Sequence, residues 1–172
     1  LKPIWLICSL VPALDLRVGQ HSLAVLVMSE VWMAGLETNH WDFCVASNDD
    51  LICIKKGPKT GTNKTEVHRL SAAHRYQKFS LQTGTGLHLS TASDFAFTLT
   101  NTDDLVCIKM GPTTGTSRTE VHILSRASNY QKFTLHTGTP LHITNHKEWA
   151  FVMDSYNDLI CIKRGPRTGT NK

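Results

Sequence analysis

The stretch Asp103–His142 reads DDLVCIKMGPTTGTSRTEVHILSRASNYQKFTLHTGTPLH. Nearly the same residues occur upstream as DDLICIKKGPKTGTNKTEVHRLSAAHRYQKFSLQTGTGLH, at Asp49–His88, and the pattern begins again at Asp158 as DLICIKRGPRTGTNK. Equivalent residues recur about every 54 positions without a gap. The chain is therefore a tandem repeat with two full copies and the first part of a third.

This period divides the chain into four segments. We assign residues 1–40 to a leader or poorly ordered segment, 41–93 to repeat 1, 94–148 to repeat 2 and 149–172 to a partial repeat 3. A repeat unit of this kind cannot bury its apolar faces alone and usually needs about three copies. We therefore expect either a fragment of a longer repeat protein or a unit that completes itself by association.

The first segment is apolar but interrupted. Pro3, Pro12 and Asp15 break it, so it does not supply the ~18 unbroken apolar residues of a membrane span. It is either the remnant of a signal peptide or a leader ahead of the natural start. Asn63 begins an N-x-T sequon that would be a glycosylation acceptor in a secreted protein, and an extracellular location is favoured over others only on these grounds.

Each copy contains four short β segments. In repeat 1 they are an aromatic segment at 41–45, a run that is apolar on both faces at 51–55, an alternating segment at 65–70 and a fourth at 78–81, closed by a T-G-T triplet. Gly-Pro, Asn-Asp and Ser-rich stretches separate them, and we interpret the T-G-T glycines as turn residues with positive φ. The pattern predicts an all-β fold of tandem four-stranded blades of a β-propeller, in an incomplete or open set. A β-trefoil is the alternative.

Charge and cysteine content exclude some functions. The net charge of +4 comes from Lys and Arg scattered through the repeats, which favours solubility and gives no support for a nucleic-acid partner. Cys53, Cys107 and Cys161 share one repeat position, and we expect them to be small buried strand residues. The cysteines and histidines show no zinc-ligand spacing, and His136 has no repeat equivalent, so we assign no metal site.

Four motifs of the chain resemble those of a known family. They are W-x-F (Trp41–Phe43), D-L-x-x-I-K (Asp50–Lys55), T-G-T-x-x-T-E-V-H-x-L-S (Thr60–Ser71) and Y-Q-x-F-x-L-x-T-G-T-x-L-H (Tyr76–His88), with their later copies. From Trp41 onward the chain resembles FG-GAP/VCBS-type propeller repeats, which include Psathyrella-type propeller lectins and repeat regions of secreted cell-wall hydrolases. The resemblance implies a propeller scaffold, and blades of this fold have many uses.

The family's calcium-binding turn is shortened here. The resemblance implies an Asp-rich loop before the D-L-x-x-I strand, but only the turns at Asp50, Asp104 and Asp158 remain, without the glycine. Because calcium takes about 6–8 oxygen ligands, we expect no cofactor and keep calcium as the alternative. The aspartates are otherwise explained as caps of tight turns through their own backbone amides.

Two groups of residues are candidates for chemistry or binding. Glu66 and His68 lie two apart on a strand and share one face, as do Glu120 and His122. A carboxylate that orients an imidazole is a general-base arrangement, but its duplication with its surroundings favours a structural or ligand-binding pair. In the second group, strand parity brings the turn before the second strand to the same end as the segment before the fourth. The polar and aromatic residues at that end are Tyr76, Gln77, Asn129, Tyr130 and Gln131.

An aromatic face beside planar amides suits a sugar ring. The leading prediction is a non-enzymatic, lectin-like protein that binds glycans at sites repeated in each blade, using the Tyr/Gln/Asn residues and the Glu–His pairs above. The alternative is a protein-interaction or structural scaffold, or the targeting region of a larger secreted hydrolase. A different use of the same tyrosines is to pack between blades. An open set of blades would also leave strand edges free for self-association.

Overall fold

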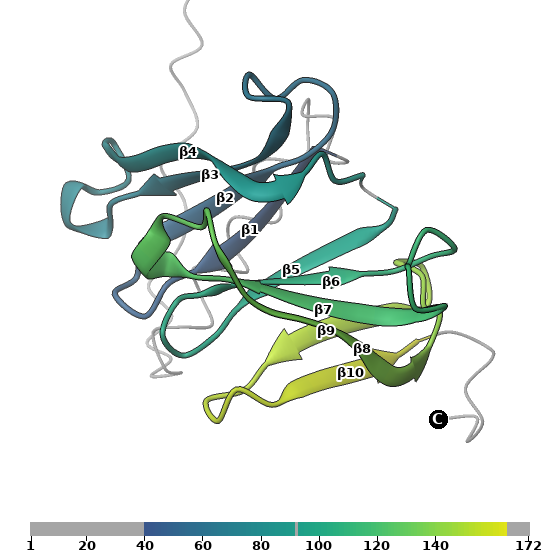
Figure 1. Cartoon of the computed structure of the whole chain (residues 1–172). Helices are drawn as coiled ribbons and strands as arrows, with labels where there is room; N and C mark the ends of the chain where they lie inside the picture. The colour runs from purple at the N-terminus through teal and green to yellow at the C-terminus, as the bar shows by residue number, and fades with distance from the viewer. Residues whose placement is uncertain (1–39, 92, 165–172) are drawn as a thin grey trace, which may run out of the picture. The chain divides into compact units, whose positions relative to one another are not determined.

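The computed structural model describes residues 40–91 and 93–164, and in those residues the fold is all-β (Figure 1). The predicted all-β class is therefore confirmed. The expectations for residues 1–39, for Ala92 and for the loop at 165–172 lie outside the described part. Thr38–Lys172 forms one compact unit, which contains every strand named below. Among the described residues, no helix has the length and apolar character needed to cross a membrane.

The strands form three antiparallel sheets, each built from one copy of the repeat. Sheet A pairs β1 (Trp41–Val45), β2 (Leu51–Lys55), β3 (Lys64–Leu70) and β4 (Phe79–His88) in chain order. Sheet B repeats this order with β5 (Phe95–Leu99), β6 (Leu105–Lys109), β7 (Arg118–Leu124) and β8 (Phe133–His142). Sheet C pairs β9 (Trp149–Met153) with β10 (Leu159–Lys163).

The strand boundaries follow the local patterns closely. The aromatic and two-face apolar segments of repeat 1 become β1 and β2 with no shift, paired from Trp41↔Lys55 to Val45↔Leu51. Two short 3₁₀ turns, η2 (Ala72–His74) and η3 (Arg126–Ser128), join the third strand of a sheet to the fourth. Each ends at a residue in the left-handed region, Arg75 and Asn129, and the next residue, Tyr76 or Tyr130, is left-handed as well.

The fourth strand differs from the prediction. It does not stop at residue 81 but continues through the T-G-T triplet to His88, and the glycines with positive φ in the described residues are Gly57 and Gly111. Glycine is instead needed at position 84 because the Thr62 side chain lies close to the backbone there, and a Cβ would be only 2.7 Å from Thr62 Oγ1. The interpretation of the T-G-T glycines as turn residues is wrong for Gly84 and Gly138, which lie in strands where the neighbouring loop requires glycine. Gly61 and Gly115 do lie in turns, but without a positive φ.

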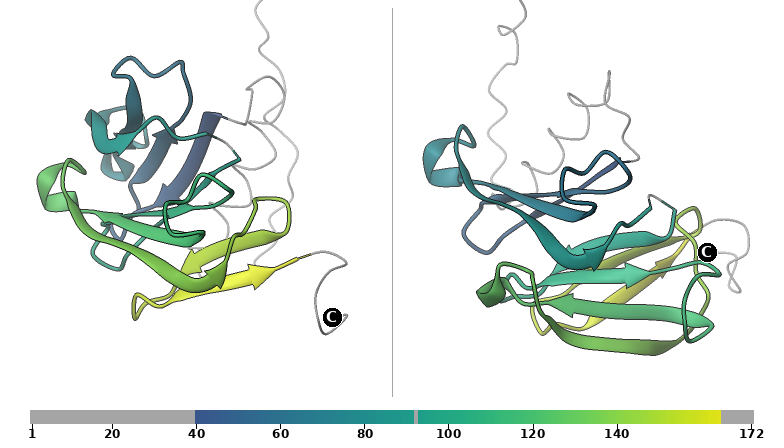
Figure 2. Two further views of the ribbon diagram at one scale, coloured as in Figure 1. Left: turned by 45° about the vertical axis from the view of Figure 1, so that its right-hand side comes forward. Right: turned by 45° about the horizontal axis from the view of Figure 1, so that its top comes forward.

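Consecutive sheets pack face to face, and the faces are equivalent by repeat (Figures 1 and 2). We call the face that carries the F-x-F aromatic residues the front, and the face that carries the second and fourth residues of the L-x-C-x-K strand the back. Ile52, Ile54 and Val67 on the back of sheet A pack against Leu105 and Cys107 on the front of sheet B, with Phe95, Phe97 and Leu99 against the same core.

The second interface repeats the first one with different residues. Val106, Ile108 and Val121 on the back of sheet B pack against Phe151 and Leu159 on the front of sheet C. Burial removes these apolar side chains from water, so the hydrophobic effect stabilises both interfaces. The stacking of one sheet on the next is therefore the unit that the sequence repeat encodes.

Candidate functional site

In repeat 1, hydrogen bonds join the turn before β2 to the segment before β4, the two segments that were predicted to form a binding site. Asp50 Oδ1 accepts from the Ala72 N–H at 2.8 Å, and Asp50 Oδ2 accepts from Arg69 Nε at 2.7 Å. The Tyr76 hydroxyl donates to the Asp49 carbonyl at 3.2 Å. The turn before β2 and the segment before β4 thus lie at one end of the sheet, as strand parity predicted.

The Asp turns have a different partner from the one predicted. Asp50 and Asp104 accept from the Ala72 and Arg126 N–H groups of the neighbouring 3₁₀ segment, and not from the backbone amides of their own turns. Burial raises the pKa of Asp50, but hydrogen bonds from the Ala72 N–H, Asn48 and Arg69 outweigh it and hold that pKa below its usual value. A calcium ion at this turn would have to displace the Arg69 guanidinium from the carboxylate.

The two tyrosines, predicted to be equivalent, have different environments. Tyr130 is 1% exposed and belongs to the core between sheets A and B, whereas Tyr76 is 41% exposed. The Tyr130 carbonyl accepts from the Gly86 N–H at 2.8 Å, and a Cβ at Gly86 would lie 2.5 Å from the Gln131 carbonyl oxygen. Tyr130 therefore packs between the sheets, and its ring has no free face for a sugar; only Tyr76 keeps one.

The amides at this end divide in the same way. Gln131 Nε2 donates to the Gly84 carbonyl and to Thr83 Oγ1, so it joins sheet B to β4 of sheet A. Gln77 and Asn129 are exposed, and Asn129 occupies the left-handed position that ends η3. The structure consequently leaves Tyr76 with Gln77 as the accessible aromatic and amide pair, and uses Tyr130 with Gln131 in an interface.

A buried acid bridges consecutive sheets at the same end. Asp103 Oδ1 accepts from the Ser47 N–H at 2.6 Å, and its Oδ2 accepts from Ser47 Oγ at 2.9 Å and from Arg126 Nη1 at 2.6 Å. Asn157 occupies the equivalent position in repeat 3, and its Oδ1 accepts from the Asn101 N–H at 2.7 Å. This bridge was not among the predicted sites, although Asp103 and Asn157 occupy the same repeat position.

The Glu–His pairs form hydrogen-bonded rows on the front faces. Glu66 Oε1 accepts from the N–H and the hydroxyl of Thr62, at 2.9 and 3.0 Å, and His68 Nε2 lies 3.3 Å from Glu66 Oε2. Gln82 Nε2 lies 3.2 Å from His68 Nδ1 and completes the row across β4. Burial raises the pKa of Glu66, but the Thr62 and His68 hydrogen bonds and the charge of Lys55 bring it below the usual value.

The row in repeat 2 differs at one residue. Glu120 keeps the same contacts with Thr116 and with His122, whose Nε2 lies 3.4 Å from Glu120 Oε2, but His136 replaces the glutamine. The ligand atoms of Glu120, His122 and His136 all lie within 4.8 Å of one another, an arrangement that can hold a metal ion. Sequence reasoning missed His136 because its proximity depends on the register His122↔His136 across the β7–β8 hairpin.

The described thiols are not poised for nucleophilic chemistry. Cys53 and Cys107 are buried as predicted, whereas Cys161 is exposed; Cys44, Cys53, Cys107 and Cys161 are all free. Burial raises the pKa of Cys44 to about 12, with a further contribution from Asp42, and raises that of Cys53 to about 11. Thiols with such pKa values stay protonated near neutral pH and are weak nucleophiles.

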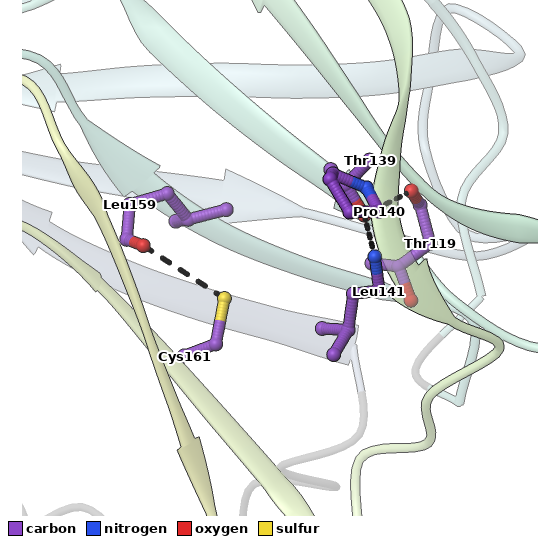
Figure 3. A pocket seen from close by; sticks show the side chains of 6 residues that line it. All are labelled: Thr119, Thr139, Pro140, Leu141, Leu159 and Cys161. Carbon is purple, nitrogen blue, oxygen red and sulfur yellow. Dashed lines mark hydrogen bonds between the residues drawn. The ribbon is translucent and has the colours of Figure 1, made fainter.

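A pocket of about 470 Å³ lies between sheets B and C (Figure 3). Its walls are Thr119, Thr139, Pro140 and Leu141 from sheet B, and Leu159 and Cys161 from sheet C. Most of the equivalent residues between sheets A and B, including Leu87 and Cys107, are buried, and there Leu124 and Tyr130 complete the core.

Comparisons of the chain with known protein families, with curated proteins and with solved structures found no match. No family is assigned on these grounds.

Proposed function

We propose that the chain is a non-enzymatic β-repeat scaffold whose sheets stack in the manner of propeller blades, and that it assembles by adding the same kind of sheet at its free faces. One observation carries this proposal. Most apolar residues that are exposed on the outermost described faces are the repeat equivalents of residues that are buried in, or packed against, the cores of the two interior interfaces.

The first free face is the front of sheet A. Phe43 is 50% exposed and Val45 is exposed as well, while their equivalents in sheet B, Phe97 and Leu99, pack against the core of the first interface. An exposed apolar face of this composition is characteristic of an interaction surface.

The second free face is the back of sheet C. Val152, Ile160 and Ile162 are exposed there, whereas Val106 and Ile108 at the latter two positions of sheet B are fully buried. The two free faces are therefore complementary to each other, as the back of sheet A is to the front of sheet B. The occupant that fits is a second copy of this chain, joined head to tail.

The test is the association state of the purified chain and of two charge variants. We expect concentration-dependent association by sedimentation, and Phe43→Glu or Ile162→Glu to weaken it about tenfold or more, since each places a charge in an apolar contact. Both side chains are exposed, so the fold should be unaffected. Tyr156→Ser, which changes an exposed aromatic on a turn, is the matched control.

Mixing the two variants separates a head-to-tail contact from other modes. Each retains one intact face, so an equimolar mixture should form a dimer that does not extend further, while each variant alone stays monomeric. A monomeric wild-type chain at the highest soluble concentration would overturn the proposal. Association that neither variant changes would point instead to the exposed edge of β10.

Glycan binding is a second candidate, supported by the exposed Tyr76 ring beside the exposed Gln77. An aromatic face next to an amide matches the apolar and polar surfaces of a sugar ring. A glycan array run with the wild-type chain and with Tyr76→Ala tests it. Binding that Tyr76→Ala abolishes would support the lectin function, and binding that this variant leaves intact would exclude this residue pair as the site.

A further inference from the structure

We propose that Glu120, His122 and His136 form a binding site for a divalent transition metal ion of the Zn²⁺ class. Two imidazoles and one carboxylate are a ligand set that zinc and related ions favour. Hard cations such as Ca²⁺ and Mg²⁺ prefer all-oxygen sites, so they are not expected here.

The spacing of two of the ligands already matches a metal centre. Ligands that each lie about 2.1 Å from a tetrahedral ion are about 3.4 Å apart. Glu120 Oε2 and His122 Nε2 are 3.4 Å apart, and all three ligand atoms are within 4.8 Å of one another. His136 is exposed, so its side chain is free to close the remaining gap by a small rotation.

The carboxylate is held in place before any ion arrives. Glu120 is 2% exposed, and its Oε1 is fixed by the Thr116 N–H at 2.8 Å and by Thr116 Oγ1 at 3.0 Å. These bonds leave Oε2 free to face His122 Nε2. Partners of this kind orient a metal ligand and raise affinity, and loss of one typically costs 10–100-fold.

The imidazoles are positioned by packing. His122 is 5% exposed and its ring lies 4.0 Å, centroid to centroid, from that of His136. Phe133 contacts both rings, with centroid distances of 6.0 and 6.3 Å.

One group opposes binding. Lys109 Nζ lies 3.9 Å from Glu120 Oε2, and its positive charge competes with a cation for this oxygen. Its side chain is a quarter exposed and can turn toward water. Replacement of this lysine by methionine should therefore strengthen binding, whereas it should not affect an ion bound elsewhere on the chain.

Repeat 1 is an internal control for the site. Glu66, His68 and Thr62 make the same contacts, but Gln82 stands where His136 stands in repeat 2. The same backbone therefore accepts either residue, so exchanging them should not disturb folding. His136→Gln removes the third ligand, and Gln82→His creates it in repeat 1.

The experiment is Zn²⁺ titration of the full chain by calorimetry, with a metal-free reductant present to keep the thiols reduced. We expect one tight site in the wild type, at least about tenfold weaker binding in His136→Gln, and two tight sites in Gln82→His. The double exchange should return to one site. Co²⁺ absorption would report the nitrogen ligands directly, and excess Ca²⁺ should not compete.

The stoichiometries distinguish this site from the other histidines of the chain. Zn²⁺ binding that is equal in the wild type and in His136→Gln would overturn the proposal, as would the absence of a tight site in the wild type. A second tight site in Gln82→His, together with loss in His136→Gln, would establish the three-residue geometry independently of any change in stability.

Discussion

At the scale of single residues, the two tyrosines show that the same residue at equivalent repeat positions can have two different structural roles. Tyr76 and Tyr130 each begin the same Y-Q-K-F tetrapeptide and both have a positive φ, yet Tyr76 is exposed and Tyr130 is buried. A non-glycine residue in this region costs on the order of 1–3 kcal/mol. In repeat 2 that cost is offset by burial of the ring between two sheets.

Tyr130→Ala should therefore destabilise the fold by about 3 kcal/mol or more, the usual effect of truncating a large buried aromatic. Tyr76→Ala should change the free energy of unfolding by less than about 1 kcal/mol, because its ring already contacts water. Urea denaturation of both variants measures the difference. Equal losses would contradict the assignment of Tyr130 to the core between sheets A and B.

The lowered pKa of Asp50 leads us to expect that the stability of the fold depends on pH. Its folded pKa lies below the unfolded value of 3.8 because donated hydrogen bonds outweigh burial, so the folded state favours the ionised form. Its contribution is fully present above that unfolded value and is lost as the pH falls through the lower folded pKa. The urea midpoint should fall with acid below about pH 4, less steeply in Asp50→Asn. The asparagine keeps an acceptor for the Ala72 N–H but does not titrate, so an unchanged slope would argue against this role.

At the scale of elements, the fourth strand of each full sheet packs closely against the loop that precedes the third strand. Gly84 and Gly138 lie beneath Thr62 and Thr116, the threonines whose hydroxyls donate to the buried glutamates. The glycines, threonines and glutamates of the two copies thus form one structural unit in each sheet. The strand continues past the T-G-T triplet because the loop folds over it.

Gly84→Ala should cost about 1–3 kcal/mol, since its methyl group would lie 2.7 Å from Thr62 Oγ1. Adding Thr62→Ala should recover part of that loss by removing the clashing atoms. Gly61→Ala is the control, because its nearest side-chain atom would be 3.6 Å away and its φ is not positive. Thermal unfolding of these variants, with Thr62→Ala alone included, tests this, because the single threonine variant measures the cost of the lost hydrogen bond to Glu66. A double variant whose loss equals the sum of the two single losses would show that the clash is not the cause.

At the scale of the whole molecule, the sheets are joined by repeated polar bridges as well as by apolar faces. Asp103 binds Ser47 of repeat 1, and Asn157 binds Asn101 of repeat 2 through the equivalent atoms. A coupling of this type stabilises the contact between neighbouring repeats, on which stacked repeats depend for stability.

Asp103→Ala should leave the Ser47 N–H without its acceptor and cost about 1–3 kcal/mol. Asp103→Asn should cost less, because Asn157 shows that an amide oxygen can fill this place. Hydrogen exchange would show faster exchange in sheet A of the alanine variant, with sheet B less affected. If both variants exchange alike, the bridge depends on the charge and its contact with Arg126 and not on the backbone hydrogen bond.

The sequence by itself determined the repeat, the all-β class and most strand boundaries. These are local properties: alternation of apolar residues, Gly-Pro and Asn-Asp turns, and a constant period are written in neighbouring residues. Strand parity also placed the Asp turns and the tyrosine segments at one end, because consecutive antiparallel strands alternate in direction. The Glu–His pairs on one face follow from the same two-residue period.

Only the tertiary structure decided which copies of a residue are free. Tyr76 and Tyr130 have nearly the same neighbours in the chain but differ in burial, because Tyr130 lies in the core between sheets A and B and Tyr76 does not. The three-ligand cluster at Glu120 likewise depends on the pairing of β7 with β8, which brings His136 beside His122. Burial and metal-ligand geometry are contacts between residues distant in sequence, so a repeated local pattern cannot specify them.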